Sequence, residues 1–340
     1  MKKIIAALIG IGIIVGFLFG AAVVFYHYMN RPTDLIVKGD YHFTIERGEA
    51  VQQVAERLED ESYVRSARFM SLAARLQKNQ NRIKHGAYKI PEGSSTTEIL
   101  DLFVSGRQML VKVTVPEGYT VSKISRLLEE KEIVDAEAFI EAAADTELVQ
   151  EYELPQDSFE GFLFPDTYFF QKMYTPEKVI ETMADNFFTV LEKIAPAYKK
   201  MSEAELREKI IVASIVEREF RVSDEAPLIA SVFYNRIAAN QRLQSCATVE
   251  YVITEVQGKE HPEFLTYDDL EIESPFNTYQ VSGLPPAPIC NPGAVAMNAA
   301  FNPAETDYYY FVLKDPDTGE HKFSKTDEEH NRAKRLYLKN

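Results

Sequence analysis

The chain has 340 residues, of which 46% are hydrophobic and 26% are charged, and its formal net charge is −15. These proportions are typical of a folded globular protein, so a wholly disordered, collagen-like or mucin-like chain is excluded. So acidic a surface repels phosphate backbones and anionic lipid headgroups, which argues against nucleic acid as a partner. The length suggests about two domains.

The first expected element is a helix that spans a membrane. No charged residue occurs from Ile4 to Tyr26, and about 20 apolar residues suffice to cross the hydrocarbon core. Lys2 and Lys3 precede this run, so the positive-inside rule assigns residues 1–3 to the cytoplasm. We therefore expect a single-pass protein of the inner (cytoplasmic) membrane, with an uncleaved anchor and an extracytoplasmic remainder.

After the anchor, one local pattern occurs three times. Phe43–Leu58, Tyr88–Phe103 and Val113–Leu128 each combine a β-branched or aromatic run, a turn that ends in glycine, and an amphipathic stretch. Alternation predicts a strand, and i, i+4 spacing predicts a helix. Three units that only build a core would have this pattern. The alternative is a glycan-binding module, because the arrangement resembles the LysM domain, which binds polymers of N-acetylglucosamine.

The three turns themselves are alike. Gly48, Gly93 and Gly118 occupy the same place in the pattern, and Pro91 and Pro116 stand two residues before the second and third glycine. Proline suits position i+1 of a turn. The Ser and Thr residues that follow the glycines suit helix N-caps. We therefore expect similar local structure at each turn.

Farther along, the segment Phe159–Phe170 gathers six aromatic residues around Glu160 and Asp166. Aromatic rings with isolated carboxylates suit a site that binds sugar. The same composition also suits a hydrophobic core. The residues alone leave both interpretations open.

The segment Met201–Phe220 predicts a helix, which begins with a capping box between Ser202 and Glu205. Its second half, Ile210–Val216, is apolar on every side and is expected to be buried. Glu217 follows at once. A carboxyl group among apolar side chains loses hydration, which raises its pKa toward the range that a general acid needs near neutral pH.

A structural role would explain the same glutamate equally well. Glu217 could form an ion pair with Arg218, Arg221 or Arg236. Glu219 lies about 200° farther round the helix and is not expected to share the site of Glu217. The sequence contains no GxSxG, HExxH or P-loop motif, and its six histidines are scattered, so we expect neither a metal nor a cofactor.

Seven blocks taken together resemble the YceG-like endolytic murein transglycosylase (MltG) family. They occur in order over residues 158–332 and read FEGFLFPDTY, IIVASIVEREF, SVFYNRI, RLQS-x-ATV, PFNTY-x(3)-GLPPAPI-x-NPG, YYYFV and EEHN. The resemblance implies a lytic transglycosylase that cleaves nascent peptidoglycan strands outside the cytoplasmic membrane. Glycan strands are then the substrate, and peptidoglycan synthases are candidate partners. The family's catalytic glutamate is the first of its ASIVE-x-E motif, which falls on Glu217.

Two departures from the family's pattern affect the expected cleft. Cys246 and Ala247 stand where members often carry Asp-Pro, and Ala287 stands where the GLPPG loop ends in glycine. Cys246 and Cys290 both lie in blocks that are expected to line the cleft of an exported domain. We therefore predict a disulfide between them.

The mechanism that the resemblance implies needs one carboxyl group. Glu217 protonates the β-1,4 oxygen between MurNAc and GlcNAc, then accepts the proton of the MurNAc C6 hydroxyl, which closes on C1 to leave a 1,6-anhydro-MurNAc end. Glu160 is a candidate second carboxylate near the oxocarbenium-like centre. The candidates for holding N-acetyl and hydroxyl groups of the substrate are Asn235, Gln244, Asn277 and Tyr279.

The expected fold class is α+β. We expect a cytoplasmic tail at residues 1–3, a transmembrane anchor at residues 4–26 and a linker at residues 27–40. Residues 41–155 are expected to form a membrane-proximal region with a small LysM-like module of strands and helices, and residues 156–340 a larger mixed α+β catalytic domain. Two other functions remain open. A non-catalytic peptidoglycan-binding scaffold would function without Glu217, and a hydrolytic muramidase would use Glu160 or Asp166 as partner and produce reducing ends.

Overall fold

The computed structural model describes residues 2–33, 41–46, 48–107, 109–172 and 174–338. Their contacts divide the chain into two compact units. Both units combine helices and strands, which confirms the predicted α+β class. Unit 1 comprises Met1–Val111 with Gln171–Met173, and unit 2 comprises Lys112–Phe170 with Tyr174–Asn340.

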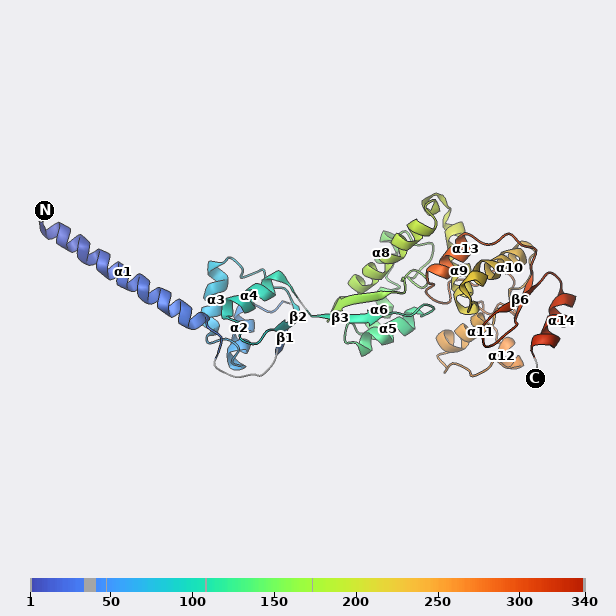
Figure 1. Ribbon diagram of the computed structural model, residues 1–340, viewed down its shortest axis with the longest axis horizontal. Helices are drawn as coiled ribbons and strands as arrows, with labels where there is room; N and C mark the ends of the chain where they lie inside the picture. Colours follow the sequence, from blue (N-terminus) through green and yellow to red (C-terminus); the bar gives the residue numbers. More distant parts are fainter. Residues whose placement is uncertain (1, 34–40, 47, 108, 173, 339–340) are drawn as a thin grey trace. The chain divides into compact units, whose positions relative to one another are not determined.

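Unit 1 begins with the long helix α1 (Lys2–Asn30), drawn in blue in Figure 1. Within it, Ile9–Asn30 has a mean hydropathy of 2.4 and is not buried by other parts of the protein. Phe17 and Phe19 are among its exposed side chains. A helix of this length and composition can cross a bilayer, so it is consistent with a membrane anchor. It continues past residue 26 into the segment predicted as a linker, of which residues 34–40 lie outside the described residues.

The rest of unit 1 is a small layer of helices on a two-stranded sheet (Figure 1). Strands β1 and β2 are antiparallel, with Tyr41 opposite Ile90 and Ile45 opposite Gly86. The apolar faces of the helices close over Phe43 and Tyr88 and form one core. The elements are β1 (Tyr41–Ile45), α2 (Val51–Asp60), α3 (Ala67–Leu76), β2 (Gly86–Ile90) and α4 (Thr96–Ser105).

The third strand–turn–helix segment belongs mainly to unit 2. Its strand β3 (Leu110–Thr114) pairs with β4 (Thr167–Gln171) and not with β1 or β2. Unit 2 therefore begins at Lys112, and the predicted domain boundary at residues 155–156 lies inside it. Pairing with a strand more than fifty residues away decides this membership, and the local pattern does not reveal that pairing. Three helices connect the two strands: α5 (Val121–Glu130), α6 (Ala136–Ala142) and α7 (Thr146–Glu151).

The remainder of unit 2 is mostly helical. The helices are α8 (Pro176–Ile194), α9 (Glu203–Glu219), α10 (Ala226–Ala238), α11 (Cys246–Tyr251), α12 (Tyr267–Leu270), α13 (Ala294–Phe301) and α14 (Asp327–Tyr337). Short 3₁₀ turns occur at Tyr198–Lys200 and Ser223–Glu225, and a π-helical turn at Val252–Val256. Strands β5 (Tyr310–Leu313) and β6 (His321–Ser324) form an antiparallel hairpin.

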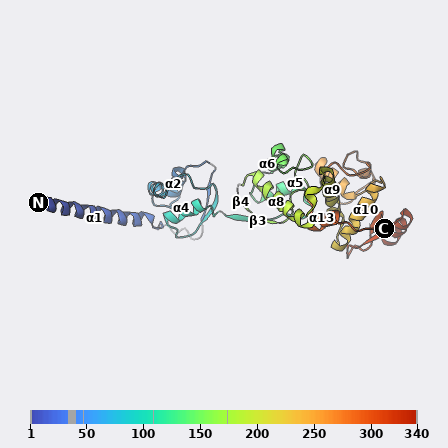
Figure 2. The ribbon, with the colours of Figure 1, turned by 90° about the horizontal axis from the view of Figure 1, so that it is seen from above.

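Helix α9 is the element around which this part of unit 2 packs. It begins at the predicted capping box, in which Ser202 and Glu205 bond each other's backbone N–H groups. Its segment Ile210–Val216 is buried, as predicted. Helices α10 and α13 lie against it (Figure 2), and α13 contributes the small side chains of Ala296, Ala299 and Ala300 to the shared core. Close packing on both sides holds the last turn of α9 in place.

Candidate active site

Glu217 lies in the last turn of α9, directly after the buried apolar segment. Its side chain is half-buried, and its Oε2 atom accepts a hydrogen bond of 2.9 Å from the backbone N–H of Gly293, the N-cap residue of α13. The pKa of Glu217 is raised to about 7: loss of hydration is the main cause and the negative charge of Glu117 adds to it, while the Gly293 N–H and Arg218 act in the opposite direction. Such a carboxyl group can both donate and accept a proton near neutral pH.

A turn from the start of unit 2 covers this carboxyl group. A β-carbon on Gly118 would lie 3.6 Å from Cγ of Glu217 and 3.5 Å from Cδ of Arg218, so the turn packs directly on the end of α9. The carboxylate of the neighbouring Glu117 occupies the space that a β-carbon of residue 293 would fill. Glu117 and Glu217 therefore meet at the same residue, Gly293. Glu117 was not predicted as a site residue, because in the sequence its turn is only one of three similar turns.

Backbone hydrogen bonds join the turn to the loop that carries Gly293. The N–H of Gly118 donates to the carbonyl of Asn291 over 3.0 Å, and the N–H of Asn291 donates to the carbonyl of Tyr119 over 2.9 Å. This reciprocal pair fixes two segments that are more than 170 residues apart in sequence. The geometry of the site at Glu217 therefore depends on both.

The side chain of Asn291 ties a third segment to the same place. Asn291 is fully buried. Its Oδ1 accepts hydrogen bonds of 2.9 Å from the N–H groups of Gly161 and Leu163, and its Nδ2 donates to the carbonyl of Tyr119 over 3.0 Å and to Glu160 over 3.1 Å. Every hydrogen-bonding atom of this amide has a partner, as a buried polar group requires. Asn291 lies within one of the family's sequence blocks, but no role was predicted for it.

Glu160 belongs to the same hydrogen-bond network as Asn291. One of its carboxylate oxygens accepts from the N–H of Val121 over 3.0 Å, and the other accepts from the amide of Asn291. Burial raises the pKa of Glu160 to about 8. Because both oxygens already have protein partners, Glu160 is not positioned as a free second carboxylate. The structure corrects the expected role to that of a buried support for the turn that carries Glu117.

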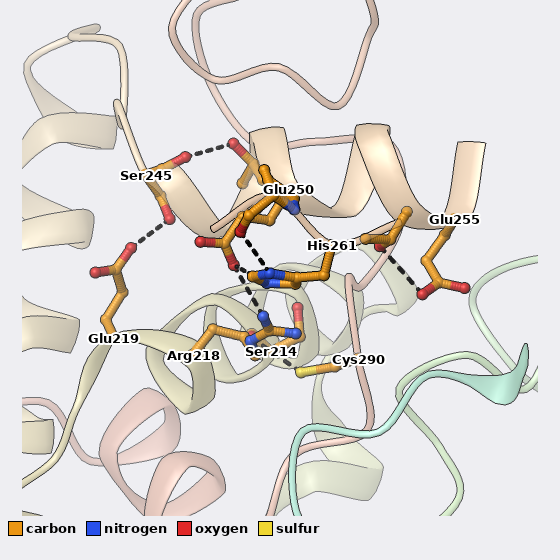
Figure 3. Close-up of polar contacts among 11 residues, drawn as sticks. Ser214, Arg218, Glu219, Ser245, Glu250, Glu255, His261 and Cys290 are labelled. Carbon is orange, nitrogen blue, oxygen red and sulfur yellow. Dashed lines mark hydrogen bonds and ion pairs between the residues drawn. The ribbon is translucent and has the colours of Figure 1, made fainter. Parts of the chain in front are cut away.

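A second cluster of polar side chains lies at the end of α9 (Figure 3). Arg218 bonds Glu250 over 2.9 Å, and His261 lies 3.3 Å from the same carboxylate. Glu219 accepts a short hydrogen bond from the hydroxyl of Ser245, and burial raises its pKa to about 7. Glu219 and Glu217 thus have different partners. No three His, Cys, Asp or Glu side chains among the described residues come together as a metal site.

Two of the predicted substrate contacts are bonded to the protein backbone instead. The side-chain amide nitrogens of Asn235 and Asn277 each donate to two backbone carbonyls, so neither has a free amide hydrogen for a sugar. The acceptors are Thr306 and Tyr308 for Asn235, and Leu270 and Ile272 for Asn277.

The other two predicted contacts lie near the polar cluster. Gln244 is exposed, with a positive φ of 53°, in the turn before α11. The hydroxyl group of Tyr279 lies 3.2 Å from the sulfur of Cys246, and burial raises the pKa of that phenol. The side chain of Gln244 is therefore exposed, whereas the hydroxyl group of Tyr279 already has a protein partner.

The structure does not contain the predicted disulfide. Cys246 is exposed beside Tyr279, whereas Cys290 is buried and donates to the carbonyl of Ser214 over 3.2 Å. Cys290 packs against α9 with its thiol directed at the helix backbone, as Figure 3 shows. Burial raises the pKa of the Cys290 thiol. The two cysteines belong to neighbouring sequence blocks, but their side chains have separate partners.

Comparison with known proteins agrees with this arrangement. The sequence pattern of the YceG-like family matches residues 43–336. The chain is 30% identical to an endolytic murein transglycosylase of Bacillus subtilis, over 94% of this chain and 91% of that protein. It is 30% identical to an endolytic murein transglycosylase of Streptococcus pneumoniae over 88% of its length, but it spans only 59% of that longer relative. A 2.6 Å crystal structure of a putative YceG-like protein from Listeria monocytogenes is similar, with a TM-score of 0.57, 30% identity and coverage of 86% of this chain and 98% of that one.

Proposed function

This chain belongs to the YceG-like family, and we propose that it is a membrane-anchored lytic transglycosylase that cleaves peptidoglycan within nascent glycan strands and so ends their elongation. The observation that carries this proposal is the environment of Glu217. Its half-buried carboxyl group has a pKa raised to about 7 and a hydrogen bond from Gly293, so it can act as acid and then as base.

The proposed reaction uses Glu217 twice. Protonated Glu217 donates its proton to the glycosidic oxygen between MurNAc and GlcNAc, and the bond from MurNAc C1 to that oxygen breaks. The resulting carboxylate, stabilised by the N–H of Gly293, accepts the proton of the MurNAc C6 hydroxyl, and the oxygen of that hydroxyl bonds to C1. The attack is intramolecular, so its effective concentration is high. Water and a cofactor are not consumed, and the product has a 1,6-anhydro-MurNAc end.

A hydrolytic muramidase is the second candidate function. A glycosidase of the usual type needs two carboxyl groups that flank the bond. Glu117, whose carboxylate lies against Gly293 beside Glu217, is the observation that favours this alternative. The two enzymes differ in their products, because a hydrolase leaves reducing ends.

We also propose roles for the parts of the chain outside the site. Lys2 and Lys3 before the apolar helix support a cytoplasmic N-terminus in the inner membrane, with unit 2 and the part of unit 1 that follows α1 outside the cytoplasm. The order of β1, α2, α3 and β2 in unit 1 supports a LysM-like module that binds glycan and brings strands to the enzyme. An enzyme that cuts nascent strands works close to peptidoglycan synthases, which are the expected protein partners. Gln244 and Tyr279 are the proposed substrate contacts.

The test is a digestion of peptidoglycan by the full-length protein in detergent micelles, with the new glycan ends identified by mass spectrometry. We expect 1,6-anhydro-MurNAc ends from the wild type and a rate on the order of 10²–10⁴-fold lower from Glu217→Gln. Circular dichroism establishes that the variant is folded. Reducing ends would make the protein a muramidase. Absence of new ends from folded wild type would favour the non-catalytic scaffold.

A further inference from the structure

Glu117 is the carboxylate that the proposed reaction leaves without a role. Its side chain is exposed, yet it does not extend freely into solvent: it lies where a β-carbon of residue 293 would be. Gly293 is the residue whose N–H holds Glu217. We propose that Glu117 is a positioning residue that acts through Glu217, by placing a negative charge at Gly293 that favours the proton-donating form of Glu217. This inference rests on the proposed function.

The position of Glu117 is fixed by the fold. The following residue, Gly118, lies over Glu217, so that an added β-carbon would be at ordinary contact distance from Cγ of Glu217, and the N–H of Gly118 is bonded to Asn291. Tyr119 accepts two further hydrogen bonds, from the backbone and from the side chain of Asn291. A side chain on so restrained a backbone stays near Gly293. Its charge therefore acts on Glu217 at short range, where salt screens it little.

Other groups that face Glu217 oppose this effect. The N-terminus of α13 directs the N–H of Gly293 at the carboxylate, and Arg218 follows on its own helix, and both favour the ionised form. Part of the charge of Arg218 is compensated by Glu250, which also contacts His261. The sulfur of Cys290 is a further titratable neighbour, and the charge of Glu217 raises the pKa of that thiol.

The opposing groups suit the two halves of the reaction. The first step needs a proton on Glu217, which Glu117 favours. The second step needs a carboxylate, which Gly293 and Arg218 favour. The neighbouring carboxylates cannot replace Glu117, because both oxygens of Glu160 bond Val121 and Asn291 and Glu219 bonds Ser245. The turn before α5 therefore shifts the balance between the two protonation states of Glu217 toward the protonated one.

The experiment is a pH–rate profile of the full-length protein in detergent micelles, with Glu117→Gln beside the wild type. Activity falls at high pH as Glu217 loses its proton. We expect this alkaline limb to move to lower pH by about half to one pH unit in Glu117→Gln, which lowers the rate above the limb about three- to tenfold. The rate below the limb should stay within about twofold of wild type. Glu117→Asp keeps the charge and should restore much of the wild-type profile.

The matched control is Glu92→Gln, which removes the same charge from the corresponding turn of unit 1. Its alkaline limb should coincide with that of the wild type. An unchanged limb in Glu117→Gln would overturn the inference, even if the rate fell equally at every pH, because a structural or substrate-binding role would do that. Equal displacement in both variants would also overturn it, since the cause would then be net charge.

A second readout does not depend on catalysis. The ¹³C signal of the Glu217 carboxyl group, identified by its absence from Glu217→Gln, is followed through a pH titration of the full-length protein. Its midpoint should be lower in Glu117→Gln than in the wild type, whichever glycan ends the enzyme produces. An unchanged midpoint would overturn the inference, whereas absence of anhydro ends would overturn only the proposed function.

Discussion

Two turns of this protein have almost the same sequence and almost the same local structure. Pro91–Gly93 and Pro116–Gly118 both read Pro-Glu-Gly. Their glycines have φ values of 76° and 75°, in the left-handed region that glycine adopts at little cost. Each turn is followed by a helix whose N-cap side chain, Ser95 or Thr120, accepts a hydrogen bond from the third helical residue.

The surroundings of the two turns differ entirely. A β-carbon on Gly93 would meet nothing within 4 Å, whereas one on Gly118 would contact Glu217 and Arg218. Strand β2 before the first turn pairs with β1, and strand β3 before the second pairs with β4. Local sequence therefore specifies the turn, and the partner of the preceding strand specifies whether the turn becomes part of an active site.

The largest effect is expected from removing the side-chain amide of Asn291, which fixes the second turn. In Asn291→Ala the N–H groups of Gly161 and Leu163 and the carboxylate of Glu160 lose a buried partner. We expect the free energy of unfolding to fall by about 3–4 kcal/mol, since each buried polar group left unsatisfied costs about 1–3 kcal/mol. Urea unfolding of the full-length protein measures this.

The matched control is Asn302→Ala, which removes an exposed asparagine whose side-chain amide donates to Asn298. It should change stability by about 0.5 kcal/mol or less. Equal losses in the two variants would mean that Asn291 does not tie the turn to the site. The turn at Gly118 would then be no more restrained than the turn at Gly93.

The next effect concerns the carboxyl group that only the second turn covers. Burial raises the pKa of Glu217 from 4.5 to about 7, so the folded state binds its proton more tightly than the unfolded state. Its contribution to stability is complete below pH 4.5 and is lost as the pH rises to about 7. Glu217→Gln avoids this loss, so we expect it to equal the wild type near pH 4 and to be more stable by about 2 kcal/mol at pH 8.

Thermal unfolding at both pH values, with circular dichroism as the signal, measures this prediction. Glu92→Gln is the control for the loss of one negative charge at an exposed position of the first turn. A Glu217→Gln variant that is equally stable, or less stable, at pH 8 would contradict the view that the covered site costs the protein stability at neutral pH.

The smallest expected effect tests how alike the two turns are. Gly93→Ala and Gly118→Ala both place a β-carbon on a backbone with positive φ, which costs about 1–2 kcal/mol. The added carbon at residue 118 would be at ordinary contact distance, 3.5 to 3.6 Å, so no further clash is expected. Urea unfolding should give losses that agree within about 0.5 kcal/mol. A much larger loss at Gly118 would show that its turn is already compressed.

Much of the candidate site could be predicted from the sequence because it is local. The capping box at Ser202, the apolar segment Ile210–Val216 and the glutamate that follows it all lie on one helix, whose period relates sequence directly to space. That pattern alone predicts a carboxyl group at the end of a buried segment. Glu117 and Asn291 escaped prediction because they contact residues more than 120 positions away in the sequence.

The sequence by itself determined the features that depend on the backbone and on hydropathy. These are the apolar N-terminal helix, the capped helices, the glycine turns and the carboxyl group at the end of a buried segment. Only the tertiary structure decided which strands pair and which partner each polar group takes. A buried amide, carboxylate or thiol must be satisfied, but a backbone carbonyl, another side chain or a substrate can each do so. Glu160, Asn277 and Cys290 therefore found protein partners, while Glu117 and Glu217 were left facing each other across Gly293.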